Sequence, residues 1–214
     1  MYQLKDILKY CAVAERRSQV IRELQLDQLP WQSPARCPSF HELTEPDYLH
    51  AIADYVRRVG GPGPGPDGVR LSECTKTELW KIARDLGHLL QEESFLPSAA
   101  RRIRHKKPNG GYRELSLRSA STRVVSTALH FGFAPHFETV YLPCSYGFRR
   151  HIGPWHMLRD MVQAIEQGFN IVVQADVEKA FDNVRPDIVL RDLRRHPIED
   201  RICAHKQHSR SNRL

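Results

Sequence analysis

The stretch that most limits how this chain can fold is the run GGPGPGPDG at residues 60–68, which we call the Gly-Pro loop. It contains five of the twelve glycines and three of the fourteen prolines in the 214 residues. Proline lacks a backbone N–H and glycine costs conformational entropy, so this run can neither continue a helix nor pair as a central strand. The sequence therefore predicts a loop or hinge here, preceded by a separate helical N-terminal region at 1–59.

The N-terminal region has the spacing of amphipathic helices. Apolar residues recur at intervals of three and four within 4–26, which predicts one or two helices. Three prolines within 29–39 predict a loop. A further helix is predicted within 41–59, with Pro46 in its first turn.

Residues 69–202 mix helical and strand periodicity, which predicts the α+β fold class. Helices are predicted at about 75–95, 121–141, 153–168 and 186–195. Residues 100–117 have the pattern of a strand, a Pro-Asn-Gly-Gly turn and a second strand. A short apolar run predicts a buried strand at 170–176, and loss of periodicity predicts an irregular tail at 203–214.

One basic segment dominates the charge of the chain. The net charge is +7 with a pI near 9.3, and residues 101–118 hold seven Lys and Arg residues against the single acid Glu114. This favours a polyanionic partner such as nucleic acid, and a solvated cationic surface is the structural alternative. No apolar stretch approaches the length of a membrane span and the first residues lack a signal-peptide core, so we expect a cytoplasmic location.

A second candidate site lies in the stretch IVVQADVEKAFDNV at 171–184, where an apolar run ends in acidic residues. In a strand, Asp176 and Glu178 point to the same side. A carboxylate at the end of a buried strand needs a cation or hydrogen-bond donors, and Mg²⁺ shared with a substrate phosphate would satisfy it. An arginine partner for Asp176, or a turn with Asp182 as its hydrogen-bonding residue, is the alternative.

Five motifs occur in a fixed order along the chain: GPDGV (65–69), KKPNGGYREL (106–115), TRVVSTAL (122–129), SYGFR (145–149) and ADVEKAFDNV (175–184). Together they resemble successive blocks of bacterial reverse transcriptases of the group II intron, or retron, type, which are RNA-directed DNA polymerases. The resemblance covers about residues 60–202. It implies reverse-transcriptase fingers that contain the β-hairpin, followed by an incomplete palm with a truncated palm sheet.

The resemblance also implies roles for individual residues. Asp176 matches the first metal-binding aspartate of the palm, with the Val177 carbonyl beside it, in a site for two Mg²⁺ ions. Phe181 matches the aromatic residue that packs under a deoxyribose and excludes a 2′-hydroxyl. Lys107 and Arg113 match the residues that bind the incoming deoxynucleoside triphosphate. An RNA template and a DNA primer are the implied partners, and two-metal nucleotidyl transfer is the implied reaction.

The chain also departs from the family pattern. The family usually continues SYGFR with Pro-Gly-Arg, where this chain has Arg150, His151 and Ile152. The Tyr-x-Asp-Asp block that supplies the remaining metal-binding aspartates is absent, and no Asp-Asp pair occurs in the sequence. We therefore expect a truncated reverse-transcriptase chain that is inactive alone, either through gene decay or with completion by a separately encoded C-terminal partner fragment. The alternative is a non-catalytic RNA-binding module that retains the basic fingers surface.

Overall fold

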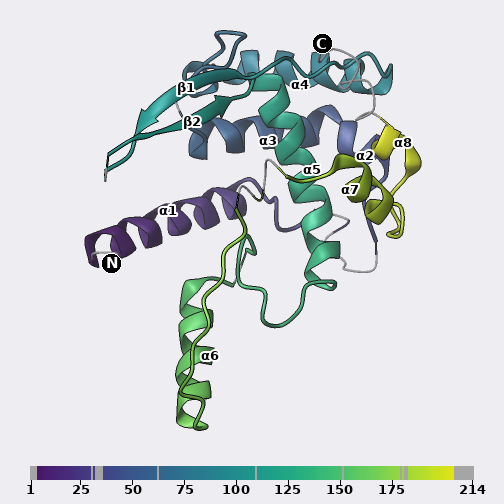
Figure 1. Cartoon of the computed structure of the whole chain (residues 1–214). Coiled ribbons are helices and arrows are strands. Elements are labelled where there is room, and N and C mark those ends of the chain that lie inside the picture. Colours follow the sequence, from purple (N-terminus) through teal and green to yellow (C-terminus); the bar gives the residue numbers. More distant parts are fainter. Residues whose placement is uncertain are drawn as a thin grey trace.

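The computed structural model describes residues 4–29, 31, 36–61, 63–108, 110–150, 152–178, 180 and 183–204, and the side chains of residues 12–203 within those ranges. Figure 1 shows the arrangement of its elements. In chain order these are α1 (Leu4–Glu23), α2 (Phe40–Thr44), α3 (Pro46–Val59), a 3-10 turn (Leu71–Glu73), α4 (Lys76–Gln91), β1 (Arg101–Lys106), β2 (Tyr112–Leu117), α5 (Ala120–Glu138), α6 (Pro154–Glu166), α7 (Pro186–Leu193) and α8 (Asp200–Ala204).

The hydrophobic core forms where α3 packs against α4 and α5. Leu49 and Ile52 on α3 are fully buried, because residues three apart share one face of a helix. Leu79 from α4 and Phe131 from α5 belong to the same buried cluster. The core therefore extends across the Gly-Pro loop, and the helices before and after that loop share one packing unit.

The described residues of the Gly-Pro loop lie outside helices and strands, and they contact the N-terminus of α5. Asp67 Oδ2 accepts a hydrogen bond from the Ala120 backbone N–H at 2.6 Å. A carboxylate at this position satisfies an unpaired helical donor and faces the positive end of the helix dipole. Arg123 Nη1 donates to the Gly61 carbonyl oxygen at 3.2 Å. These contacts fasten the loop to the helix that follows the hairpin.

Gly65 lies where the loop approaches the backbone before α5 most closely. A Cβ at this position would lie 2.4 Å from the Arg118 carbonyl oxygen and 2.6 Å from Ser119 Cα. We expect Gly65→Ala to lower the free energy of unfolding by about 1–3 kcal/mol, because backbone must move to relieve the overlap. Gly61→Ala is the matched control, since a Cβ there meets nothing within 4 Å. Equal melting temperatures for the two variants in thermal unfolding would contradict the close approach.

The predicted hairpin is confirmed. Strands β1 and β2 pair antiparallel over their full lengths. Gly110 and Gly111 in the turn have φ angles of +86° and +77°, which glycine adopts without steric cost. The Lys107 backbone N–H donates to the Gly111 carbonyl oxygen at 3.0 Å and closes the turn. The local turn sequence is therefore sufficient to explain where the chain reverses.

The predicted helices are present, with small differences at their ends. The Thr75 hydroxyl accepts from the Glu78 backbone N–H, and the Glu78 side chain accepts from the Thr75 backbone N–H, which forms a capping box for α4. Gly168 follows α6 at a φ of +96°, as expected for a helix stop. The N-terminal pattern forms the single helix α1. In the described part of the chain, no helix combines the length and the apolar character needed to cross a membrane.

The buried strand predicted at 170–176 is wrong. The segment lies outside helices and strands, and the sheet in the described part of the chain is the two-stranded pair β1–β2. Ile171 and Val173 are 84% and 88% exposed. A strand needs a neighbouring backbone to satisfy its N–H and C=O groups, and no described segment supplies one here. The expected truncated palm sheet is consequently not formed by the described residues.

The irregular tail begins later than residue 203. Cys203 lies in α8 and is 2% exposed, where it packs with Cys37 and Ile198 in a second, smaller cluster. Its burial requires residues from near the N-terminal helices, so local periodicity gives no sign of it. The remaining predicted tail, residues 205–214, lies outside the described residues.

Candidate nucleic-acid interface

The β1–β2 hairpin has two distinct faces, because directly opposite residues of antiparallel strands point to the same side. One side, which we call the outer face, consists of the opposed pairs Arg102–Ser116, Arg104–Glu114 and Lys106–Tyr112. The other side, the inner face, consists of the pairs Arg101–Leu117, Ile103–Leu115 and His105–Arg113. The alternation thus places three cations and a tyrosine together on the outer face.

Burial identifies which face is turned toward the body of the protein. Ile103, Leu115 and Leu117 on the inner face are partly buried, whereas every residue of the outer face is exposed. Leu117 also lies close to the Gly-Pro loop, since a Cβ at Gly63 would be 3.1 Å from Leu117 Cδ1. The inner apolar residues therefore anchor the hairpin, and the outer face remains open to solvent.

The outer face keeps most of its positive charge. Its one acid, Glu114, lies 4.0 Å from Arg102 Nη1, and their side chains are 58% and 79% exposed. An ion pair this exposed and this long contributes little, because water and salt screen it. Tyr112 is 65% exposed beside these cations and offers an aromatic ring to solvent. The sequence motif had not singled out Tyr112, although pairing across the predicted turn places it opposite Lys106.

Lys107 and Arg113 lie at the same end of the hairpin. Lys107 directly follows β1, and its backbone N–H pairs with Gly111. Arg113 lies in β2 opposite His105 and belongs to the inner face. Both predicted nucleotide-binding side chains are exposed. The structure therefore brings together the backbones of the two residues near the hairpin tip.

Asp176 and Val177 lie in an exposed segment far along the chain from the hairpin. Asp176 Oδ1 accepts a hydrogen bond from the Val177 backbone N–H at 2.9 Å. In Figure 1 the trace that follows α6 runs back along that helix toward the body of the protein. Phe181 and Asp182 lie outside the described residues. Among the described residues, no hydrogen bond or ion pair joins Asp176 to Lys107 or Arg113.

The described residues do not fit the two-ion magnesium site that the resemblance implies. No three His, Cys, Asp or Glu residues in the described part of the chain are grouped so that they could hold a metal ion. Asp176 could provide one carboxylate and Val177 one backbone oxygen. Mg²⁺ requires near-octahedral coordination by oxygen atoms, so this pair alone leaves the ion without fixed geometry.

The side chains of the SYGFR motif at 145–149 form hydrogen bonds and an ion pair that join this loop to the helices on either side of it. Arg149 forms an ion pair with Glu138 at 2.8 Å and donates to the Ser145 carbonyl oxygen at 3.0 Å. The Tyr146 hydroxyl donates to Asp160 Oδ2 at 2.6 Å, and this bond raises the pKa of Tyr146 and lowers the pKa of Asp160. These contacts connect the loop to α5 on one side and to α6 on the other.

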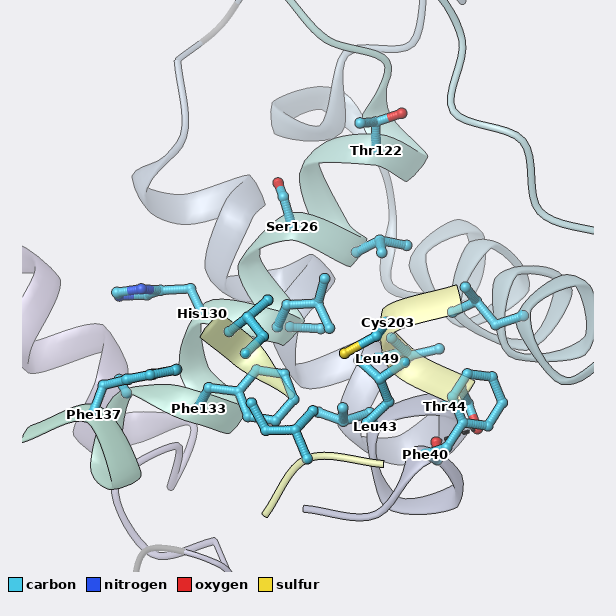
Figure 2. A pocket seen from close by; sticks show the side chains of 18 of the residues that line it. Phe40, Leu43, Thr44, Leu49, Thr122, Ser126, His130, Phe133, Phe137 and Cys203 are labelled. Carbon is cyan, nitrogen blue, oxygen red and sulfur yellow. Dashed lines mark hydrogen bonds between the residues drawn. The ribbon is translucent and has the colours of Figure 1, made fainter. Parts of the chain in front are cut away.

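A cavity of about 520 Å³ lies along α5, and Figure 2 shows side chains that line it from α2, α5 and α8. Its walls are mostly apolar, with Leu43 and Phe133 as examples. Arg150 also lines it, and its guanidinium lies 4.5 Å above the Phe131 ring centroid. Burial lowers the pKa of Arg150, and burial together with Arg150 lowers the pKa of His130. The cavity joins segments distant in sequence, so no local motif could predict it.

Comparison with known proteins gives two relatives. The chain is 28% identical over 170 residues to Protein YkfC of Escherichia coli, an alignment that covers 75% of this chain and 43% of YkfC. It is 25% identical over 145 residues to a COX1/OXI3 intron 1 protein of Saccharomyces cerevisiae, which covers 66% of this chain and 17% of that protein. The chain therefore spans less than half the length of either curated relative. No family model matches the chain.

Proposed function

We propose that this chain is the nucleic-acid-binding fingers and partial palm of a reverse-transcriptase-type polymerase, and that the outer face of its hairpin binds single-stranded RNA. The observation that carries the proposal is the exposed row of Arg102, Arg104 and Lys106, opposed by one weakly paired acid. The ordered sequence motifs and the similarity to an intron 1 protein support the polymerase family.

The outer face has the chemistry that a nucleic-acid backbone requires. Alternate residues of a strand are about 6.7 Å apart, so its three cations are spaced along the strand and can contact successive phosphates. Arg102 and Arg104 can each hold a phosphate through a bidentate fork, and Lys106 can act as a point charge. Binding releases condensed counterions, which makes the affinity depend strongly on salt.

Tyr112 favours a single strand over a duplex. Its ring is exposed on the same face as the cations, opposite Lys106. An unpaired base can stack on an aromatic ring, and such stacking contributes about 1–3 kcal/mol per base. The bases of an A-form duplex are already stacked and its major groove is too narrow for side chains to read. The combination of phosphate contacts and one stacking ring therefore fits an RNA template strand.

The polymerase chemistry requires groups beyond those described in this chain. We assign Lys107 and Arg113 to the incoming triphosphate, Phe181 to its deoxyribose, and Asp176 with the Val177 carbonyl to part of a magnesium site. The Asp176 carboxylate and the Val177 carbonyl cannot by themselves fix the positions of two Mg²⁺ ions. A C-terminal partner fragment that supplies further carboxylates would be needed for RNA-directed DNA synthesis.

The purified chain is expected to bind a primer–template but to give no extension product with Mg²⁺ and deoxynucleotides. The physical reason is that Asp176 belongs to no group of three or more His, Cys, Asp or Glu residues that could hold a metal ion in the described part of the chain. Gel analysis of a labelled primer tests this, with fluorescence anisotropy in the same buffer as proof that the template is bound. Extension that disappears in Asp176→Ala would show that the chain assembles a complete site.

A non-catalytic RNA-binding module is the second candidate. It is favoured by the Asp176 carboxylate, which is exposed and accepts a local hydrogen bond from the Val177 backbone N–H. Both candidates predict RNA binding by the outer face. They differ in deoxynucleotide binding, which the polymerase portion requires through Lys107 and Arg113 and a simple RNA-binding module does not.

A further inference from the structure

Glu114 is the only acid on the outer face of the hairpin, and it lies at the centre of that face. Tyr112 and Ser116 lie on either side of it along β2, and Arg104 lies opposite it on β1. A carboxylate here repels phosphate and weakens the attraction of the three cations for a nucleic-acid backbone. Phosphate binding alone therefore does not account for an acid at this position.

An ion pair within the hairpin does not account for it either. Directly opposite residues of two antiparallel strands are the pair best placed to interact. Within the described part of the hairpin, Glu114 nevertheless forms no ion pair with Arg104, and its ion pair with Arg102 is exposed and 4.0 Å long. No described residue donates a hydrogen bond to its carboxylate. The carboxylate oxygens are therefore available to a ligand.

The residues around Glu114 indicate how a nucleotide would lie on the outer face. The cations of β1 hold the phosphates, and the exposed Tyr112 ring on β2 stacks with a base. The sugar joins the phosphate to the base, so it lies over the boundary between the two strands. Paired strands are about 4.8 Å apart, and Glu114 is about 6.7 Å from Tyr112 along β2. A sugar between Arg104 and Tyr112 is therefore within reach of the Glu114 side chain.

The chemistry of that sugar determines what Glu114 can contact. A ribose carries a 2′-hydroxyl on the carbon next to the one that bears the base, and a deoxyribose does not. The hydroxyl can donate a hydrogen bond, and an ionised carboxylate accepts hydrogen bonds but cannot donate them. A bond of this kind to a charged acceptor is stronger than one between neutral groups. RNA would thus gain a contact that offsets the repulsion of its phosphates, whereas DNA meets the repulsion alone.

We infer that Glu114 makes the outer face selective for RNA over DNA by accepting a hydrogen bond from a ribose 2′-hydroxyl. The inference rests on the proposed binding of a single strand by this face, and it identifies the residue that distinguishes the two kinds of strand. Glu114 weakens phosphate binding in both, and only RNA recovers the loss. Because the selectivity arises at the sugar, it does not depend on the base sequence.

Fluorescence anisotropy with labelled oligouridine and oligodeoxyuridine of equal length tests this selectivity, because the two strands differ only in the 2′-hydroxyl. The wild-type chain should bind the RNA about tenfold more tightly, which corresponds to one solvent-exposed hydrogen bond to a charged group. Glu114→Ala should bring the ratio of the two affinities close to one, mainly because removal of the repulsion strengthens DNA binding. A wild-type ratio near one, or an unchanged ratio in Glu114→Ala, would overturn the inference.

Glu73→Ala is the matched control for the loss of one acid. Glu73 forms a similarly long and exposed ion pair with Arg70, at 3.8 Å, and it lies outside the hairpin. This variant changes the net charge by the same amount, and its ratio of RNA to DNA affinity should equal that of the wild type. An equal fall of the ratio in Glu73→Ala and Glu114→Ala would assign the selectivity to net charge and overturn the inference.

The triple replacement of Arg102, Arg104 and Lys106 by alanine separates a failure of this inference from a failure of the proposed function. If the triple variant loses affinity for both strands while Glu114→Ala keeps the wild-type ratio, the outer face binds nucleic acid and the role assigned to Glu114 is wrong. If the triple variant binds RNA as tightly as the wild type, the proposed function itself fails, and the inference fails with it.

Discussion

Replacing Phe131 by alanine is expected to lower the free energy of unfolding by about 3–5 kcal/mol. The side chain is 2% exposed and lies in the core shared by α3, α4 and α5. Its ring meets Tyr55 edge-on, with centroids 4.8 Å apart, and the Arg150 guanidinium covers it at 4.5 Å. Truncation would open a cavity and remove both ring contacts at once.

Phe169→Ala is the matched control for this change, because Phe169 is 68% exposed. The same chemical deletion at the surface should change the free energy of unfolding by about 0.5 kcal/mol or less. Urea denaturation of the three proteins, followed by far-ultraviolet circular dichroism, gives both values. Similar midpoints for the two variants would mean that α5 does not form the centre of the core.

Replacing Arg102, Arg104 and Lys106 together by alanine is expected to weaken single-stranded RNA binding by about a hundredfold at low salt. Three hydrogen bonds to phosphate at about 1 kcal/mol each give a loss of this size. The three side chains are exposed on the outer face, so the fold should be unaffected. Fluorescence anisotropy with a labelled oligonucleotide measures the loss, and thermal unfolding checks the fold.

A second triple variant separates a local effect from a general effect of charge. Arg159, Arg185 and Arg195 are exposed cations outside the hairpin, and their replacement by alanine lowers the net charge by the same amount. The outer-face assignment predicts nearly normal RNA affinity for this control. A similar loss in both triple variants would mean that RNA binding follows net charge alone and has no particular site on the hairpin.

Turns and helix ends whose conformation depends on residues close in the sequence could be predicted from the sequence. The two glycines of the turn allow positive φ and fix the hairpin. Thr75 and Glu78 form a local capping box that fixes the start of α4. In the same way, Gly168 marks the end of α6. Each of these depends on contacts within a few residues, so a pattern in the sequence is sufficient.

Features that depend on distant segments could not be predicted in the same way. The apolar run at 170–176 has a strand pattern, but a strand forms only when a partner lies beside it. The contact of Asp67 with the start of α5 joins positions 53 residues apart. The cavity beside Phe133 likewise requires α2, α5 and α8 to meet. The spacing of apolar residues and the secondary-structure propensities of single residues contain no information about contacts between distant segments.

The same distinction between local and distant contacts applies to the candidate site. The basic hairpin was evident from its composition, and strand register then added Tyr112 to its outer face. The position of Asp176 was different, because its predicted role required a sheet that the described residues do not form. Residue type alone indicated a metal ligand, whereas coordination depends on groups brought together from elsewhere in the fold.

The salt dependence of RNA binding tests the role of the outer face most directly. For single strands, the slope of log affinity against log salt is about −0.7 per phosphate contact. Loss of Arg102, Arg104 and Lys106 should therefore make the wild-type slope shallower by about 2, while the control triple variant at Arg159, Arg185 and Arg195 leaves it unchanged. Parallel lines for the wild type and the outer-face variant would contradict nucleic-acid binding by this face.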